Sequence, residues 1–195
     1  MNPSIVAETF LERLRNSTAQ SHQELEGLPV SESIISPQVT NQDYVAYLAL
    51  MHDVVKDAEE NIFPILAPVI PDLEERNKTH LLEADLKHLG HTKIAYAKAI
   101  TNGLSNCTTA FALGIMYVIE GSTLGGRFIL KNINTLLAHD EANGAAYFNG
   151  YGNHTGSRWK NFLNIMVAYE GEHDCETEIT AGANYAFNAI SRHLS

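Results

Sequence analysis

The chain has 195 residues, of which 45% are hydrophobic and 18% are charged, and its formal net charge is −10 with histidine neutral. This length suits one domain with a sizeable core, so residues 1–195 are expected to form a single domain. The negative charge argues against nucleic acid as the main partner and, more weakly, against an anionic membrane surface, because both attract basic proteins.

The N-terminal segment, MNPSIVAETFLERLR, contains acidic side chains and lacks a continuous apolar core, which is unlike a signal peptide. No stretch approaches the roughly 18 apolar residues of a membrane span. The two cysteines, Cys107 and Cys175, are far apart and have no metal-type spacing, which favours free thiols over a disulfide. We therefore expect a cytoplasmic protein without a membrane span.

The first predicted helix ends at Gly27, because a glycine followed by Pro29 terminates helices. Its inner face is expected to hold Ile5, Phe10, Leu11, Leu14 and Thr18. The second predicted helix begins near Thr40, where Thr-Asn-Gln-Asp resembles a capping box, and it ends at Pro64.

Prolines at 64, 68 and 71 indicate a connector rich in turns. Further helices are predicted over residues 72–89, 93–100 and 108–138, followed by a loop over 141–155 and by two last helices over 157–170 and 176–194. The chain has no alternating strand pattern. It is therefore predicted to be all-α, with about seven or eight helices.

The predicted helix over residues 108–138 contains three glycines in the segment YVIEGSTLGGRF. Each glycine costs a helix interior about 0.8–1 kcal/mol relative to alanine, so the three together cost roughly 2–3 kcal/mol. Their missing side chains favour either close packing of a second helix or a bend that lets the backbone approach a large flat ligand. Gly114, Gly121 and Gly125 share one face, and periodicity alone leaves both roles open.

His22 is the candidate metal ligand on the first predicted helix, in the segment LRNSTAQSHQELEG. Glu26 follows four residues later on the same face, where its carboxylate can accept a hydrogen bond from one imidazole nitrogen. The other nitrogen is then free to bind a metal as the neutral tautomer. Arg15 lies two turns earlier, roughly 10 Å along the axis, where it can meet an anionic group. The competing interpretation is an ordinary surface histidine.

These two segments together resemble the haem oxygenases, particularly the bacterial branch that includes enzymes accompanying bacteriophytochromes. The family's proximal-helix pattern is matched by Leu14, Arg15, Thr18, His22, Leu25 and Glu26. Its distal-helix pattern is matched by Tyr117, Val118, Glu120, Gly121, Ser122, Leu124, Gly125 and Gly126. The segments YFNGYG and RWKNF resemble the later loop and helix, so the resemblance covers most of the chain in the right order.

The resemblance implies an all-α bundle with haem between a proximal helix and a kinked distal helix. His22 would be the proximal ligand of the haem iron, and Glu26 would orient it. Gly121, Gly125 and Gly126 would let the distal helix kink over the macrocycle.

The resemblance also implies polar contacts around the haem. Arg15 and Lys160 stand where the family often has basic residues that meet the propionates, with Arg158 as a neighbour, and Tyr117 is a further polar contact. Ser122 replaces an aspartate that organises distal water in many animal-type members. The bacterial branch commonly has serine there, which leaves open how the distal water is held. The expected catalytic positions are Gly121, Ser122 and Gly125.

The implied reaction is the oxidative opening of the haem ring, in which haem, dioxygen and external electrons give biliverdin, free iron and carbon monoxide. Haem would be both substrate and cofactor. The electrons would come from a ferredoxin, a flavodoxin or a reductase, and the product could supply a bilin-accepting phytochrome. An acidic donor would need a local basic patch, for which Arg127, Lys131 and Lys160 are the candidates.

Two other functions remain open. A haem carrier or sensor on the same fold would bind haem without turnover. A relative that binds no haem, such as a di-metal oxidase or a thiaminase-like enzyme, would need inward carboxylates and histidines or a nucleophilic cysteine. The nearest hints of a metal site are Glu170, Glu172, His173, His88 and His91.

Overall fold

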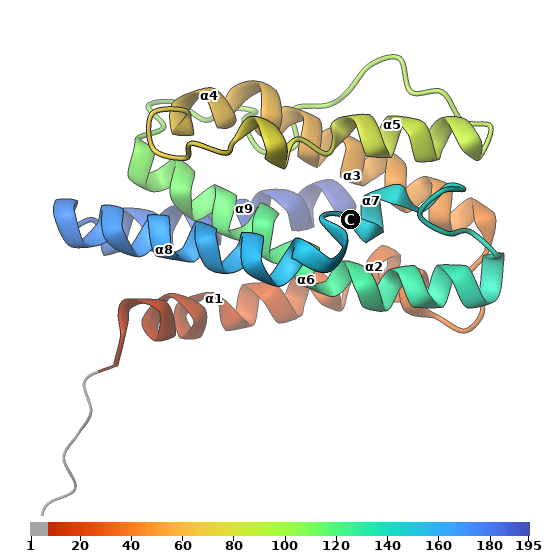
Figure 1. The fold of residues 1–195 in the computed structure, drawn as a ribbon, viewed down its shortest axis with the longest axis horizontal. Helices are drawn as coiled ribbons and strands as arrows, with labels where there is room; N and C mark the ends of the chain where they lie inside the picture. The colour runs from red at the N-terminus through yellow and green to blue at the C-terminus, as the bar shows by residue number, and fades with distance from the viewer. Residues whose placement is uncertain (1–7) are drawn as a thin grey trace, which may run out of the picture.

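The computed structural model describes residues 8–195 and shows α-helices joined by short connections (Figure 1). In chain order the elements are α1 (Phe10–Glu26), α2 (Pro29–Ile35), α3 (Asn41–Asn61), α4 (Phe63–Leu66), the 3₁₀ helix η1 (Glu74–Arg76), α5 (Thr79–His88), α6 (Thr109–Leu137), α7 (Ala146–Asn149), the 3₁₀ helix η2 (Gly152–His154), α8 (Thr155–His173) and α9 (Glu176–Leu194). Between residues 8 and 195 there is no β-strand, only isolated bridges around Asp140. The predicted all-α class is confirmed.

The longest helix, α6, is the centre of the bundle. It packs along α9, α9 also supports α1, and α3 pairs with α5 (Figure 1). In Figure 1 the first half of α6 runs obliquely across the bundle and its second half follows the long axis. Side chains with no exposed surface form the core between these layers, among them Leu14, Leu48, Leu113, Met116, Phe162 and Ile179.

Local capping explains where several helices begin. Thr9 and Glu12 form a capping box at α1, Thr40 and Asp43 form the predicted one at α3, and the Thr108 hydroxyl caps α6. Each cap provides a partner for an amide of the first turn, which is worth about 0.5–2 kcal/mol.

The first helix ends at Gly27 as predicted, but Pro29 does not end the helical region. Pro29 is the first residue of α2, because the first turn of a helix does not need the N–H that proline lacks. Phe10, Leu14 and Thr18 are buried as expected, whereas Ile5 lies outside the described residues.

The helix predicted over residues 72–89 is divided, and this prediction was wrong. The chain forms η1, becomes extended at Asn77 with ψ 131°, and starts α5 only at Thr79. Arg76 and Lys78 are both buried and both reach the carboxylate of Glu120 on α6. A continuous helix would turn two residues at this spacing to different sides.

The helix predicted over residues 93–100 is not formed either. Asp53 of α3 accepts a hydrogen bond from the Ala97 amide at 2.9 Å and pairs with the Lys93 ammonium at 2.6 Å. Asp57, one turn further along α3, accepts from the Thr101 amide at 2.7 Å. These carboxylates take up amides that a helix would bond internally, so the segment forms no helix.

The predicted loop over residues 141–155 contains the short helices α7 and η2. Gly150 and Gly152 have φ values of 53° and 55°, which glycine adopts without steric cost, and they form the turn between these helices. The two last helices are present, and α8 is longer than predicted at both ends. Within residues 8–195, no helix combines the length and the hydropathy that crossing a bilayer requires.

Candidate functional site

The helix that carries His22 and the helix that carries the glycines meet at Tyr117. Burial raises the pKa of Tyr117, while Thr18 and Arg15 of α1 lie close enough to oppose this rise. His22 is one turn beyond Thr18 along α1, and Gly121 is one turn beyond Tyr117 along α6. Both helices run in the same general direction (Figure 1). His22 and Gly121 therefore lie at the same level of two neighbouring helices.

The imidazole of His22 is open to solvent, with 58% of the side chain exposed. Its Nε2 lies 3.4 Å from Oε1 of Glu26, which is the pair that the spacing predicts. The ring packs against Phe187 of α9, with 5.5 Å between the ring centroids. The carboxylate therefore lies beside Nε2, and an imidazole nitrogen that carries no proton can bind a metal. Sequence patterns did not indicate Phe187 as a neighbour, because it comes from the far end of the chain.

Two of the glycines of α6 serve close packing. A Cβ on Gly114 would lie 2.0 Å from the Ile179 carbonyl oxygen of α9, and a Cβ on Gly126 would lie 2.7 Å from the Phe148 carbonyl oxygen of α7. Neither backbone neighbour can move easily, so only glycine fits at these positions. The same holds for Gly182 of α9, which the sequence did not single out.

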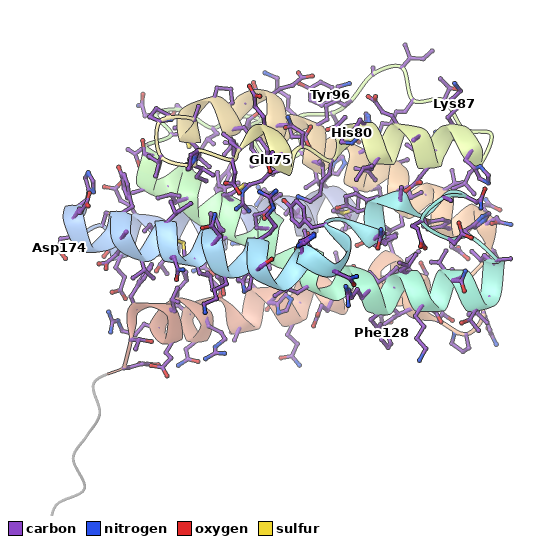
Figure 2. All side chains as sticks on the ribbon, viewed as in Figure 1. Glu75, His80, Lys87, Tyr96, Phe128 and Asp174 are labelled. Atoms are coloured by element: carbon purple, nitrogen blue, oxygen red, sulfur yellow. The ribbon has the colours of Figure 1, made fainter. Side chains whose placement is uncertain are left out.

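Packing does not explain the other two glycines. A Cβ on Gly121 would meet the Trp159 ring of α8 at 3.6 Å, an ordinary contact, and a Cβ on Gly125 would meet nothing within 4 Å. Next to Gly125, the side chains of Leu124 and Phe128 are 48% and 65% exposed. Phe128 projects from the side of α6 that faces away from α5 (Figure 2). Large exposed apolar side chains beside bare backbone suit a flat apolar ligand.

We call this region the α1–α6 site. It is defined by His22, Tyr117, Gly121, Gly125 and Phe128.

Two basic residues come from the elements next to the α1–α6 site: Arg15 is a neighbour of Tyr117, and Lys160 follows Trp159, whose ring lies against Gly121. Arg15 of α1 and Lys160 of α8 are exposed, and in the described part of the chain neither forms an ion pair. Arg158 is instead bound to two carboxylates, donating to Oδ2 of Asp72 at 2.7 Å and contacting Glu75. Arg15 and Lys160 are thus free to meet an anionic group, whereas Arg158 is engaged elsewhere.

Ser122 lies at the edge of a cavity on the other side of α6. Its hydroxyl donates to the Ile119 carbonyl oxygen at 2.8 Å, and the residue lines a cavity of about 40 Å³ between α6, α3 and α7. The side chains of Tyr47, Lys78 and Tyr147 line the same cavity. Its volume gives room for about two or three water molecules.

A buried charge cluster adjoins this cavity. The Glu120 side chain has no exposed surface and accepts from Arg76 at 2.5 Å, Lys78 at 2.9 Å and Tyr151 at 2.7 Å. Burial lowers the pKa of Lys78 although Glu120 opposes this shift, and burial raises the pKa of Tyr151. The sequence feature that could have indicated this cluster is Glu120, a single carboxylate within an apolar helix. A buried carboxylate needs cationic or hydrogen-bonding partners, so its presence there predicts such partners.

The side chains that suggested a di-metal site do not form a cluster in the described part of the chain. Nδ1 of His173 lies 2.8 Å from the Tyr169 carbonyl oxygen, and the imidazole stacks on the Tyr169 ring at the exposed end of α8. Across residues 8–195, no three side chains of His, Cys, Asp or Glu are grouped as a metal site would need.

Comparison with known proteins assigns the family. A family model described as Heme oxygenase matches residues 8–194. The chain belongs to the heme oxygenase family. Heme oxygenase PigA of Pseudomonas aeruginosa is 29% identical over 182 residues, which cover 91% of this chain and 87% of that protein.

Solved structures of heme oxygenases share the fold. The NO- and CO-bound heme oxygenase from Neisseria meningitidis is 25% identical, with a TM-score of 0.78 over 96% of this chain and 91% of that chain. The heme oxygenase from Leptospira interrogans has a TM-score of 0.80 at 16% identity over 96% of this chain and 99% of that one. Heme oxygenase-1 from Synechocystis in complex with heme has a TM-score of 0.71 at 17% identity over 96% and 91%. The resemblance to bacterial heme oxygenases is confirmed.

Proposed function

We propose that this member of the heme oxygenase family binds haem at the α1–α6 site and opens its ring oxidatively. Haem, dioxygen and external electrons would give biliverdin, iron and carbon monoxide. The observation that carries the proposal is the pairing of an exposed imidazole, His22, with an open glycine backbone, Gly125, on the helix beside it.

The residues of the α1–α6 site fit haem by their chemistry. His22 would offer an imidazole nitrogen to the iron, and the Glu26 carboxylate lies 3.4 Å from Nε2 of the same ring. Gly125 presents open backbone where a side chain would keep a planar ring away, and Gly121 lies one turn earlier beside the Trp159 ring. When bound, haem supplies the redox centre at which oxygen reacts, and the protein supplies ligation, orientation and control of water.

The propionates of haem would meet the free cations around the α1–α6 site. Arg15 and Lys160 are exposed and unpaired among the described residues, so they can pair with carboxylates at the edge of the ring. Tyr117 adds a hydroxyl beside Arg15. Arg158 is left out of the proposal because Asp72 and Glu75 already neutralise it.

The first prediction is that wild-type protein binds one haem and consumes it. Trp159 is the one tryptophan of the chain and lies against Gly121, so its fluorescence should be quenched as haem is added. With a reductant and air, the Soret band should disappear while biliverdin absorption rises. His22→Ala should lose the imidazole-ligated spectrum, and the exposed His173→Ala is the matched control.

Wild-type-like spectra and turnover in His22→Ala would contradict the assignment of the ligand. The outcome also separates the enzyme from a haem carrier or sensor on the same fold. A carrier would quench Trp159 and show the Soret band, but it would keep that band in the presence of reductant and air.

The second prediction concerns the electron donor, for which we propose an acidic protein of the ferredoxin or flavodoxin class or a reductase. Lys131 and Lys160 are exposed and lie on α6 and α8 next to the α1–α6 site, whereas Arg127 is already bonded to Gly152 and Asn153. Lys131→Glu should slow reduction of bound haem about 10-fold at low salt, with a smaller effect at high salt, and Lys160 is left unchanged because it is proposed to meet a propionate. Lys87→Glu on α5 is the control, and an equal effect there would argue against a local docking patch.

A further inference from the structure

Three asparagines of the chain are followed directly by glycine, at positions 102, 143 and 149. Asparagine is a chemically labile residue, and a following glycine makes it more so because no side chain shields the glycine nitrogen. That nitrogen can attack Cγ of the asparagine and displace the side-chain amide. Whether a given pair reacts in the folded protein depends on how firmly the fold holds both groups.

The end of α7 holds the pair Asn149–Gly150. The Gly150 amide donates to the carbonyl oxygens of Ala146 at 3.2 Å and Tyr147 at 3.0 Å. These hydrogen bonds must break before the Gly150 nitrogen can attack, and this local opening costs free energy. The pair is therefore protected while α7 is formed.

The loop between α6 and α7 holds the pair Asn143–Gly144. The Asn143 side chain donates to Oδ1 of Asp140 at 3.0 Å, and its backbone amide donates to the Asp140 carbonyl oxygen at 3.0 Å. Gly144 is buried, and its carbonyl oxygen accepts from the Tyr44 hydroxyl at 2.8 Å. Neither partner of this pair can turn into the geometry of attack without local opening.

The pair Asn102–Gly103 is different, because it lies in an exposed turn. The turn is closed by a hydrogen bond from the Leu104 amide to the Thr101 carbonyl oxygen at 3.0 Å. Within residues 8–195, no hydrogen bond holds the Asn102 side chain or the Gly103 amide. Gly103 has a φ of 77°, and a Cβ placed on it would meet nothing within 4 Å. Both reacting groups are therefore open to solvent and free to approach each other.

We propose that Asn102 is a site of spontaneous deamidation, at which the folded chain acquires an additional negative charge. The Gly103 nitrogen forms a bond to Cγ of Asn102, the bond from Cγ to Nδ2 breaks, and ammonia leaves with the proton of the Gly103 amide. Water then opens the resulting five-membered succinimide ring at either carbonyl carbon and gives aspartate or isoaspartate. This inference is independent of the proposed function.

The backbone just before the turn is anchored, so the modification should act on the turn itself. Asp57 of α3 accepts from the amides of Ile100 and Thr101, both at 2.7 Å, and Tyr185 of α9 donates to the Ile100 carbonyl oxygen at 2.8 Å. Isoaspartate at position 102 would insert a methylene group into the backbone directly after these anchors. We therefore expect the isoaspartyl form to unfold at a lower temperature than the unmodified protein.

The test follows all three pairs in one sample of the full chain, incubated at mildly alkaline pH and digested at intervals for mass spectrometry. In the folded protein, Asn102 should deamidate at least about 10-fold faster than Asn143 and Asn149, because these two react only from locally opened states. In guanidinium the three rates should converge, because the unfolded chain no longer holds any of the pairs. Labelling by an isoaspartyl methyltransferase should mark the peptide that contains position 102.

Two matched variants identify the charged product. Asn102→Ser should abolish the acidic form that ion-exchange chromatography separates from incubated protein, whereas Asn143→Ser should leave it. Deamidation of Asn143 or Asn149 as fast as that of Asn102 in the folded protein would overturn the proposal. So would an Asn102 that stays intact in the folded protein while the unfolded chain reacts, because the turn would then hold the pair.

Discussion

Glu120 is a fully buried carboxylate that pairs with two buried cations. Its side chain has no exposed surface, and it lies between Arg76 and Lys78 with Tyr151 completing its hydrogen bonds. Removing an ion from water costs several kcal/mol, and such a group is retained only where its partners are all in place. The cluster also fixes the backbone between η1 and α5, since both cations come from that connection.

The third prediction therefore concerns Glu120→Gln. Removing this charge leaves two buried cations with too little compensation, so the free energy of unfolding should fall by about 3–5 kcal/mol. Denaturant unfolding followed by circular dichroism measures this change. Glu75→Gln is the control, because Glu75 pairs with Arg158 at an exposed position and should cost less than about 1 kcal/mol. Equal losses in the two variants would contradict the account.

Local signals predicted part of the site at the level of residues. The spacing of His22 and Glu26 was enough to predict their contact, because residues four apart share a helical face. The engagement of Arg158 was not predictable, since its partner Asp72 is 86 positions away in the chain. The cavity beside Ser122 could not be predicted from the sequence either, because the residues that line it come from separate helices.

At the scale of elements, α6 shows how one helix uses glycine for two purposes. Gly114 and Gly126 admit neighbouring backbone, whereas Gly125 leaves its side of the helix bare. Sequence periodicity placed the three glycines in one helix but could not separate these roles. The separation depends on which positions α9 and α7 happen to cover.

The fourth prediction follows from this division. Gly125→Ala should stabilise haem-free protein by up to about 1 kcal/mol, because alanine favours the helix and its Cβ meets nothing within 4 Å. Gly114→Ala should instead destabilise by about 1–3 kcal/mol, because its Cβ would overlap the Ile179 carbonyl oxygen. Thermal unfolding of the two variants measures both signs, and destabilisation by Gly125→Ala would show that this face is packed.

Helix boundaries were predictable where the cause is local and unpredictable where it is not. The capping box at Thr40 marked the start of α3 correctly. The segment over residues 93–100 has a helical pattern, yet Asp53 and Asp57 accept hydrogen bonds from its amides and it forms no helix. Pro29 reads equally as the end of one helix or the start of another, and only packing decides between these readings.

At the scale of the whole molecule, buried tyrosines determine how stability depends on alkaline pH. Burial raises the pKa values of Tyr44, Tyr47, Tyr147 and Tyr151 above their ordinary value. Above about pH 10 the unfolded chain loses these phenolic protons while the folded chain keeps them. Their contribution to the free energy of unfolding is therefore complete below pH 10 and is lost as the pH rises above it. Lys78 acts in the opposite sense because burial lowers its pKa, but it is one group against several tyrosines, which also include Tyr117.

The fifth prediction is a fall in the free energy of unfolding between pH 9 and pH 11. Each retained proton contributes a slope of about 1.4 kcal/mol per pH unit, so Tyr44→Phe should reduce the slope by up to that amount. Guanidinium unfolding at several pH values gives the slope, and absorbance at 295 nm follows the phenolate. Stability that is constant or rising over this range would contradict the burial of these hydroxyls.

The support that α9 gives to both α1 and α6 has a mechanical consequence. These two helices rest on the same third helix and touch each other little beyond Tyr117. The distance between the His22 imidazole and the open backbone of Gly125 therefore depends on how α1 packs on α9. If haem binds between them as proposed, a tilt of α1 on α9 would adjust this distance, while α6 and the buried ion pairs of Glu120 would keep their places.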